Sequence, residues 1–370
     1  MGQADIRVLV TGDLVLDEPD GAHWLSGLAP TLHAADLVIG HLEVPHTACG
    51  QEVAGDVPAP GAPPENLAAI AAAGFDLLSL AGNHMADCGA QGIADTVAEL
   101  DRLGLGHAGA GANLAAARAP AIAEVSGRRV AVLSYNCVGP EFSWATSDSA
   151  GCAYLPMATA DGEPLSPRAD LQGLLPQALE ILAADIAAAR AVADTVIVAL
   201  HKGVVHTPAH LAPYERPAAH AAIELGADAV IGHHAHILRG VEFHQGKPIF
   251  HGLGNCCVVT RALSPQQDNA ARSEWARQRK AIFGFEPDPA YYLAPFHPQA
   301  VNAVLGQLTI DGAGRISAAI VPVFIEAPGR PVLADPAQAR AIAAYLARIG
   351  VTAGLPPITI DDRFCISEAA

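Results

Sequence analysis

The chain has 370 residues, of which 51% are hydrophobic and 16% charged, so it can bury a large core and is not an intrinsically disordered protein. Its formal net charge of −17 disfavours nucleic acid as a partner, because binding a phosphate backbone requires a basic surface. Anionic small molecules stay compatible with this charge, since bound cations reverse the local field.

The start of the chain and its cysteines indicate a cytoplasmic protein. Residues Met1 to Arg7 lack the basic region and apolar core of a secretory signal. No apolar run reaches the roughly 20 residues that a membrane helix needs. The seven cysteines are scattered and never spaced as CxxC, which fits reduced thiols better than disulfides. We expect no membrane partner, and a homo-oligomer is compatible with the sequence.

The first part of the chain alternates short apolar strands with helices. Strands of this kind, connected by helices, are typical of a sheet covered on both faces. We expect strands at Ile6–Val10, Asp36–Ile39, Phe75–Leu80, Ala121–Val125 and Arg129–Ser134, and helices at Trp24–Ala34, Glu65–Ala73 and Gln91–Leu103. The last two strands are predicted to form a hairpin.

The second part resumes the alternation after an irregular stretch from Asn136 to Arg168, and stretches of that length are usually functional. The pattern predicts an α/β fold of two sheets with helices outside. We expect one domain over residues 1–330, with substrate loops at 136–170 and 262–300, and a C-terminal helix and tail at 331–370 packed on it. The expected strands are Thr195–Leu200, Ala227–Ile231, Gly240–Phe243, Pro248–Phe250, Ala303–Ile310 and Ile316–Phe324, and the helices are Leu174–Ala193, Pro213–Leu225, Ala271–Phe283 and Pro336–Ile349.

Five of the predicted strands are followed by carboxylate, imidazole or carboxamide side chains. Such groups gathered at strand ends suggest one pocket, and divalent metal is the ligand they fit best. In an extended chain, the spacing of His234 and His236 would place both rings on one side of the backbone, able to serve two ions. The sequences are Gly12-Asp13, His41-Leu42-Glu43, Gly82-Asn83-His84, His201-Lys202-Gly203 and Gly232-His-His-Ala-His236.

Several of these residues also have a structural explanation. Asp13 taken alone is typical of a turn. Asp87 either orients the imidazole of His84 or caps the helix that follows. Lys202 either transfers protons or is an ordinary surface lysine. His41 is either close to the metal or a hydrogen-bonded core histidine.

Motifs that match a known family run in order over about residues 6–257. They include Gly12-Asp13, Leu42-Glu43, Asn83-His84, His107-Ala-Gly-Ala-Gly111, Gly226-Ala-Asp228, Gly232-His-His-Ala-His236 and Leu253-Gly-Asn255. With them the chain resembles the CapA family, the poly-gamma-glutamate capsule-synthesis type, within the calcineurin-like metallophosphatase superfamily. The resemblance implies a four-layer αββα sandwich with a dinuclear metal site at strand ends.

The resemblance also implies a role for each strand-end residue. His84 would be the general acid. The superfamily's usual Asp-x-His is missing because Val15 replaces the histidine, so the first ion is expected to be weaker or absent. Mixed oxygen and nitrogen ligands suit Mn, Fe or Zn. One divalent ion would be held by Asp13, Glu43 and His236, and the other by Glu43, Asn83, His201 and His234.

These roles predict a metal-dependent hydrolase of a small phosphoester, amide or lactone. Two alternatives remain: a metal-dependent epimerase, since the family includes a lasso-peptide epimerase, and a non-catalytic factor in poly-gamma-glutamate synthesis or export. The substrate is expected to be a small or peptide-like molecule. The candidate substrate-binding residues are His41, Lys202, His206, Trp144, Tyr291 and His297, with loop packing as the alternative for the aromatic ones.

Overall fold

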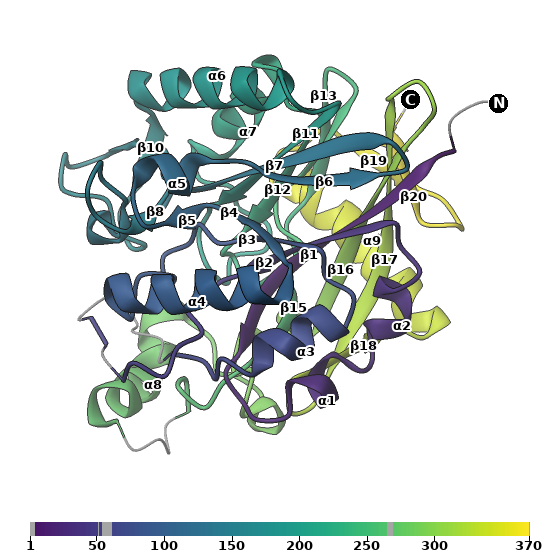
Figure 1. Cartoon of the computed structure of the whole chain (residues 1–370). Helices are drawn as coiled ribbons and strands as arrows, with labels where there is room; N and C mark the ends of the chain where they lie inside the picture. The colour runs from purple at the N-terminus through teal and green to yellow at the C-terminus, as the bar shows by residue number, and fades with distance from the viewer. Residues whose placement is uncertain (1–3, 51, 54–60, 265–268, 370) are drawn as a thin grey trace.

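A computed structural model of the chain describes residues 4–50, 52–53, 61–264 and 269–369. Two β-sheets lie face to face, and helices cover the outer side of each (Figure 1). Residues 265–268 of the second expected substrate loop, and residues 1–3 of the expected domain, lie outside the described ranges.

The first sheet has ten strands in the order β19-β20-β17-β16-β1-β2-β3-β4, with β15 pairing β1 and β18 pairing β17. Helices α1 to α4 pack on its outer face, where side chains such as Leu9 and Leu78 contact Leu67 and Ile93 in one apolar cluster. The strands that carry polar ends are β1 (Ile6–Leu16), β2 (Leu37–Leu42) and β3 (Leu77–Ser79), which run parallel to one another and to β4 (Gly106–Ala108). The helices are α1 (Gly21–Leu25), α2 (Ala29–Leu32), α3 (Asn66–Ala72) and α4 (Gly89–Leu103).

The second sheet has six strands in the order β13-β14-β12-β11-β7-β6. Helices α6 (Pro176–Arg190) and α7 (Glu215–Glu224) pack on its outer face. The strands are β6 (Ala121–Val125), β7 (Arg128–Asn136), β11 (Thr195–His201), β12 (Ala229–His233), β13 (Val241–His244) and β14 (Lys247–Phe250).

Alternation along the strands divides their side chains between two cores. In β1, Val8 and Val10 enter the core between the sheets, whereas Leu9 points to the helices outside. In β12, Ile231 likewise points inward and Val230 outward. Both faces of these strands are therefore buried, which explains why they are apolar without interruption. The expected four-layer αββα sandwich is confirmed.

The C-terminal segment closes one end of the core between the sheets. Helix α9 (Pro336–Thr352) begins at Asp335, whose carboxylate accepts from the backbone N–H groups of Ala337 and Gln338 in a capping box. Its residues Ile342, Leu346 and Ile349 join the inter-sheet cluster. The residues after it were expected to be a tail, but they form β19 (Ile358–Ile360) and β20 (Cys365–Glu368), which extend the first sheet from β17.

No helix in the described ranges combines the length and hydropathy needed to cross a bilayer.

The remaining elements surround the polar ends of the strands or complete the sheets. These elements are β5 (Ala110–Gly111), α5 (Leu114–Arg118), η1 (Glu141–Ser143), β8 (Gly151–Cys152), β9 (Met157–Thr159), β10 (Leu171–Leu174), β15 (Asn255–Val259), α8 (Ala270–Phe283), η2 (Pro289–Tyr291), η3 (Pro298–Val301), β16 (Asn302–Ile310), β17 (Ile316–Glu326) and β18 (Arg330–Leu333).

Strand β1 runs six residues beyond its expected end at Val10. Up to that residue it pairs with β16, and from Asp13 onward it pairs with β15, with an irregularity in register between the two parts. The change of neighbour brings Gly12 against the backbone of Gly254, whose oxygen would lie 1.8 Å from a β-carbon at position 12. Gly12 is thus required by a close backbone approach inside a strand, not by a turn that ends it.

We predict that Gly12→Ala lowers the free energy of unfolding by at least about 2 kcal/mol, because the backbone of Gly254 must move to admit a methyl group. Gly173→Ala is the matched control, since a β-carbon there meets no atom within 4 Å. Chemical denaturation should place the control within about 0.5 kcal/mol of the wild type. Equal stability of the two variants would contradict this account of Gly12.

Candidate metal centre

The polar ends of strands from both sheets meet at one place in the sandwich. Parallel strands of one sheet end at the same edge, so β1, β2 and β3 deliver Asp13, Glu43 and Asn83 side by side. The facing sheet delivers the histidines that end β11 and follow β12. Three sets of ligand-type atoms there lie within 4.8 Å of one another: Asp13, Glu43 and His236; Glu43, His201 and His234; and Asp13, His41 and His201.

The first set links the two sheets through His236. Its Nε2 atom lies 3.3 Å from Oε1 of Glu43, and its Nδ1 atom lies 3.5 Å from Oδ2 of Asp13. Nδ1 is also 2.9 Å from Oδ1 of Asn255, which helps to orient the ring. Both carboxylates are almost fully buried.

The second set lies around His201 at the end of β11. Its Nε2 atom is 3.9 Å from Oε1 of Glu43 and 2.7 Å from Oδ1 of Asn83. The rings of His201 and His234 have their centroids 4.7 Å apart. Glu43 therefore faces both sets, as a bridging carboxylate would.

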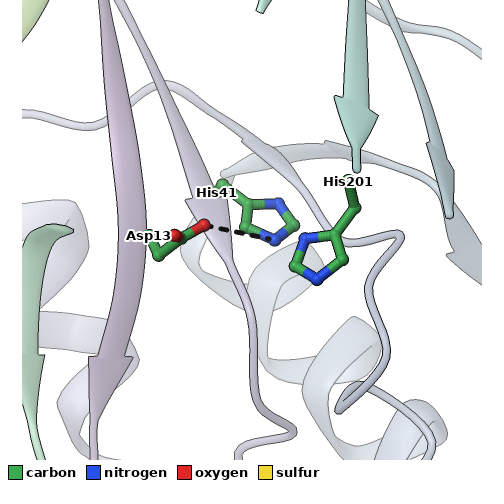
Figure 2. Close-up of side chains that lie close together, drawn as sticks. All are labelled: Asp13, His41 and His201. Atoms are coloured by element: carbon green, nitrogen blue, oxygen red, sulfur yellow. Dashed lines mark ion pairs between the residues drawn. The ribbon is translucent and has the colours of Figure 1, made fainter. Parts of the chain in front are cut away.

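His41 belongs to the third set and was expected to bind substrate. Figure 2 shows it between Asp13 and His201, with its Nε2 atom 3.9 Å from Oδ1 of Asp13. Nδ1 is 2.9 Å from the hydroxyl of Ser79, and the ring is fully buried. It faces the carboxylate cluster and does not line the cavity described below, so the geometry does not support the predicted contact with substrate, which stays a prediction.

Buried ligand-type atoms without partners test whether the cluster fits a cation. Within the described part of the chain, Oε2 of Glu43, Nε2 of His41, Nδ1 of His201 and both ring nitrogens of His234 are buried without a hydrogen bond. A buried polar atom left unpaired costs about 1–3 kcal/mol, so several in one place need an explanation. Divalent cations bound by these oxygen and nitrogen donors would satisfy them. The donor set therefore fits metal, although that binding stays a prediction.

The electrostatics of the two carboxylates support the same interpretation. Burial and the nearby charge of Glu43 raise the pKa of Asp13 to about 8. Burial also opposes ionisation of Glu43, but His236 outweighs it and lowers the pKa of that carboxyl to about 2. Two adjacent buried carboxylates can both ionise only if positive charge is supplied close by.

The backbone that carries His234 and His236 is not extended, contrary to expectation. Their φ angles are 85° and 52°, in the left-handed region that residues other than glycine rarely adopt. The two rings thus reach the cluster from a tight turn after β12. Strained backbone of this kind is concentrated at functional sites.

His84 lies beside the cluster and is paired with Asp87. Its Nδ1 atom is 2.7 Å from Oδ2 of Asp87. Burial opposes the charged imidazolium, but the Asp87 carboxylate outweighs it and raises the pKa of His84. The alternative that Asp87 caps the next helix is wrong, because the cap position of α4 is Cys88.

A cavity of about 550 Å³ opens onto this centre. Its floor includes Asn83, His84, His234 and His236. His206 lies in the wall, as a residue that contacts substrate must, and its ring packs edge-on against Phe283 with a centroid distance of 4.9 Å. Residues 167–171, α8 and Phe296 of the wall lie within or next to the expected substrate loops, whereas residues 203–214 of the wall lie outside both loops.

The other aromatic candidates for substrate contact lie away from this cavity. Trp144 stacks on Tyr154 with a centroid distance of 4.0 Å. Tyr291 donates from its hydroxyl to the Ile325 carbonyl, and His297 accepts from the backbone N–H of Gln299. None of the three predicted residues lines this cavity, although Tyr291 and His297 line a smaller one nearby, so their contact with substrate stays a prediction.

Comparisons with known proteins identify relatives of the chain. The family model described as bacterial capsule synthesis protein PGA_cap matches residues 7–259. A probable polyglutamine synthesis accessory protein of Mycobacterium tuberculosis is 33% identical over 195 residues, 52% of this chain and 47% of that protein. The capsule biosynthesis protein CapA of Bacillus anthracis is 32% identical over 191 residues, 52% of this chain and 42% of that protein. The chain thus matches less than half the length of these relatives.

Solved structures also align with the chain over most of its length. A calcineurin-like phosphoesterase of Bacillus subtilis covers 95% of this chain and 98% of its own, at 13% identity and a TM-score of 0.38. The anchor protein of the Plasmodium inner membrane complex covers 94% and 96%, at 10% identity and a TM-score of 0.40.

A buried charge cluster, formed by Lys202, Glu215 and Arg239, holds the cavity wall and was not predicted. All three side chains are fully buried, so Lys202 is not a surface lysine, and it does not line the cavity. Glu215 accepts from Lys202 at 3.0 Å and from Arg239 at 2.9 Å. Arg239 also donates to the carbonyls of Val204 and His210, at both ends of the segment that enters the cavity. Sequence offers no signal for this, because charged residues are usually exposed.

We predict that Glu215→Gln lowers the free energy of unfolding by about 3–5 kcal/mol, because it leaves two buried cations without their carboxylate. Glu274→Gln is the matched control, since Glu274 is exposed and pairs with Arg277 on the surface; its stability should equal the wild type. Burial opposes ionisation of Glu215, yet Arg239 and Lys202 outweigh it and lower its pKa from 4.5 to about 2. The advantage of the wild type should therefore be complete above about pH 4.5 and decline toward pH 2. An unchanged variant would show that the cluster adds no stability.

Proposed function

Because the chain belongs to the bacterial capsule synthesis protein PGA_cap family, we propose that it is a metal-dependent hydrolase whose centre is the Asp13–Glu43 cluster. The observation that carries this proposal is the set of buried, unpartnered ligand atoms on Glu43, His41, His201 and His234, of which His234 also lines the cavity, next to the His84–Asp87 pair. Unpartnered buried polar atoms do not stabilise a core, whereas cation binding would satisfy those of Glu43, His201 and His234 that act as ligands.

Each part of the centre has a task in this proposal. Asp13, Glu43 and His236 hold one cation, and Glu43, Asn83, His201 and His234 hold the other. Bound divalent cations supply Lewis-acid stabilisation and a water nucleophile that is active near neutral pH. Manganese, iron and zinc all suit this mixture of donors.

The protein's own side chains provide the proton transfer. Asp87 holds Nδ1 of His84, so Nε2 is the nitrogen left to donate a proton to the leaving group. The raised pKa of His84, set by Asp87 against burial, keeps that proton in place. The cavity volume of about 550 Å³ suits a small phosphoester, amide or lactone.

The epimerase alternative loses Lys202, the second base that the sequence suggested. Epimerisation needs groups that remove and return a proton on opposite faces of one carbon, and Lys202 was the candidate partner of the histidine. Its Nζ atom is 3.0 Å from both Glu215 and Nδ1 of His251, and the side chain does not reach the cavity. Lys202 is therefore unsuited to that role, which supports hydrolysis as the proposed reaction.

A non-catalytic role is the second alternative, and it follows the printed names of the relatives. One of them is called an accessory protein for polyglutamine synthesis. In such a role the same fold would serve polymer synthesis without turnover, and the donors of the cluster would need no metal. Metal content therefore separates this alternative from the proposed enzyme.

We predict that protein purified without chelator contains Mn, Fe or Zn, measured by elemental analysis. His234→Ala should lower the bound metal substantially, because both nitrogens of this buried ring are available only to a ligand at the centre. His220→Ala is the control, since His220 lies on α7 and pairs with Glu242 outside the centre. Equal metal content in both variants, or none in the wild type, would count against the proposal.

We predict that His84→Asn keeps the metal and lowers turnover by on the order of 10²–10⁴-fold, because the general acid is lost while the ligands stay. Turnover is measured with panels of phosphoester, amide and lactone compounds, which identify the substrate. Hydrolysis is recognised by the incorporation of oxygen from isotopically labelled water into the product. Loss of metal in this variant would make His84 a ligand. Solvent deuterium at a carbon, with no bond cleaved, would establish the epimerase instead.

A further inference from the structure

Helix α8 carries a buried guanidinium that has no carboxylate partner. The side chain of Arg279 is only 4% exposed. Its Nη1 atom donates to the carbonyl of Pro295 at 2.6 Å and its Nη2 atom to the carbonyl of Leu263 at 2.8 Å. Its charged end lies over the ring of Trp275, 4.9 Å from the centroid. No carboxylate of the described residues lies within ion-pair distance, so the charge itself is uncompensated.

Other buried cations of this chain are paired with carboxylates. Lys202 and Arg239 share the carboxylate of Glu215, and Arg272, on the same helix as Arg279, pairs with Glu52. Buried charges are paired as a rule, because removing an ion from water is costly. Burial lowers the pKa of Arg279 to about 10, with no neighbouring carboxylate to raise it. An anion from outside the chain is the natural partner.

A second unpartnered donor lies next to the guanidinium. The Nε1 atom of Trp275 is buried and, among the described residues, donates to no acceptor. An indole N–H can only donate, as can a guanidinium. Both Arg279 and Trp275 line the cavity that opens onto the metal centre. A cation without a counter-charge and an N–H without an acceptor, both in one wall, select an anionic ligand that brings acceptor atoms.

The surroundings of these donors are apolar and continuous with the centre. Ile282, Phe283 and Phe296 line the same cavity. His206 connects the two regions: its ring is 4.9 Å from that of Phe283 and 6.1 Å from that of His236, centroid to centroid. Phe296 in turn stacks on His236 at 4.8 Å. A ligand bound at α8 is therefore within a small molecule's length of the cluster.

We propose that the α8 subsite, formed by Arg279, Trp275, Phe283 and Phe296, binds an oxyanion, carboxylate or phosphate, that is carried on an apolar stem. The guanidinium and the indole N–H receive the oxyanion, and the aromatic rings pack on the stem. Combined with the proposed function, this describes a substrate with two ends, one that reacts at the metal centre and one that is anchored at α8. The substrate statement rests on the proposed function, whereas the anion site does not.

The test compares charged and neutral ligands of one shape on the full chain as purified. Calorimetry should show 3-phenylpropionate or phenyl phosphate binding the wild type at least about tenfold more tightly than neutral 3-phenylpropionamide, because a hydrogen bond to a charged group is the stronger kind. Arg279→Gln should bring that ratio close to one, and Trp275→Phe should reduce it. Arg277→Gln, on the exposed face of the same helix, should leave it unchanged.

Chelation separates this site from the metal centre. The ratio should persist after metal removal, even if the protein proves to be no hydrolase. A preference that disappears on chelation but survives Arg279→Gln would place the anion on the metal and overturn the proposal. Absence of any preference in the wild type at millimolar ligand would overturn it as well. Should Arg279→Gln not fold, Arg279→Lys, expected to keep the preference, and Trp275→Phe decide the question.

Discussion

Two carboxylates buried side by side, Asp13 and Glu43, set the condition that the rest of the centre must meet. Burial and mutual repulsion work against their ionisation, as the raised pKa of Asp13 shows. The first sheet supplies both acids, from β1 and β2, and its own His84 and His41 lower the pKa of Glu43 less than His236 of the other sheet does. Imidazoles of the opposite sheet stabilise the ionised carboxylates: His236 contacts both of them, and His201 lies near Glu43. The site therefore exists only if the two sheets are held in fixed alignment.

Backbone contacts between the sheets provide that alignment. The N–H of His234 donates to Asp13 at 3.3 Å, and Nε2 of His233 lies 3.0 Å from the Thr11 carbonyl. On the far side of the site the hydroxyl of Ser134 accepts from the N–H of Ala81 at 3.2 Å. Strand β7 is thereby tied to the segment that carries Asn83 and His84. Movement of one sheet by a fraction of a residue would break these contacts together with the cluster, so stability and site geometry are coupled.

Sequence predicts those features that depend on local pattern. Apolar runs located the central strands, and the polar residues after them located Asp13, Glu43, Asn83, His201 and the His234–His236 turn, because parallel strands must end together. Features that depend on distant partners were missed. The extension of β1 follows from pairing with β15, about 240 residues away, and β19 and β20 follow from pairing near β17. Helix α8 has the arginine-rich composition of a solvated helix, and nothing local shows that Arg279 turns inward.

One physical criterion, a buried charged or polar group without its partner, identifies both ends of the cavity. At the metal centre the surplus is negative and consists of acceptors, so the missing partners are cations. At α8 the surplus is the positive charge of Arg279 together with the unpartnered N–H of Trp275, so the missing partner is an anion. The two ends share one apolar-walled space. A ligand with an oxyanion at one end is therefore oriented before any reaction, because the reverse orientation leaves the guanidinium unpaired and puts the apolar stem against the charged cluster. Because the unpaired charges at the two ends of the cavity have opposite signs, the cost of leaving either one buried and unpaired decides which way round the ligand binds. The overall charge of −17 would by itself repel anions, so the local positive charge at α8 is what attracts the oxyanion.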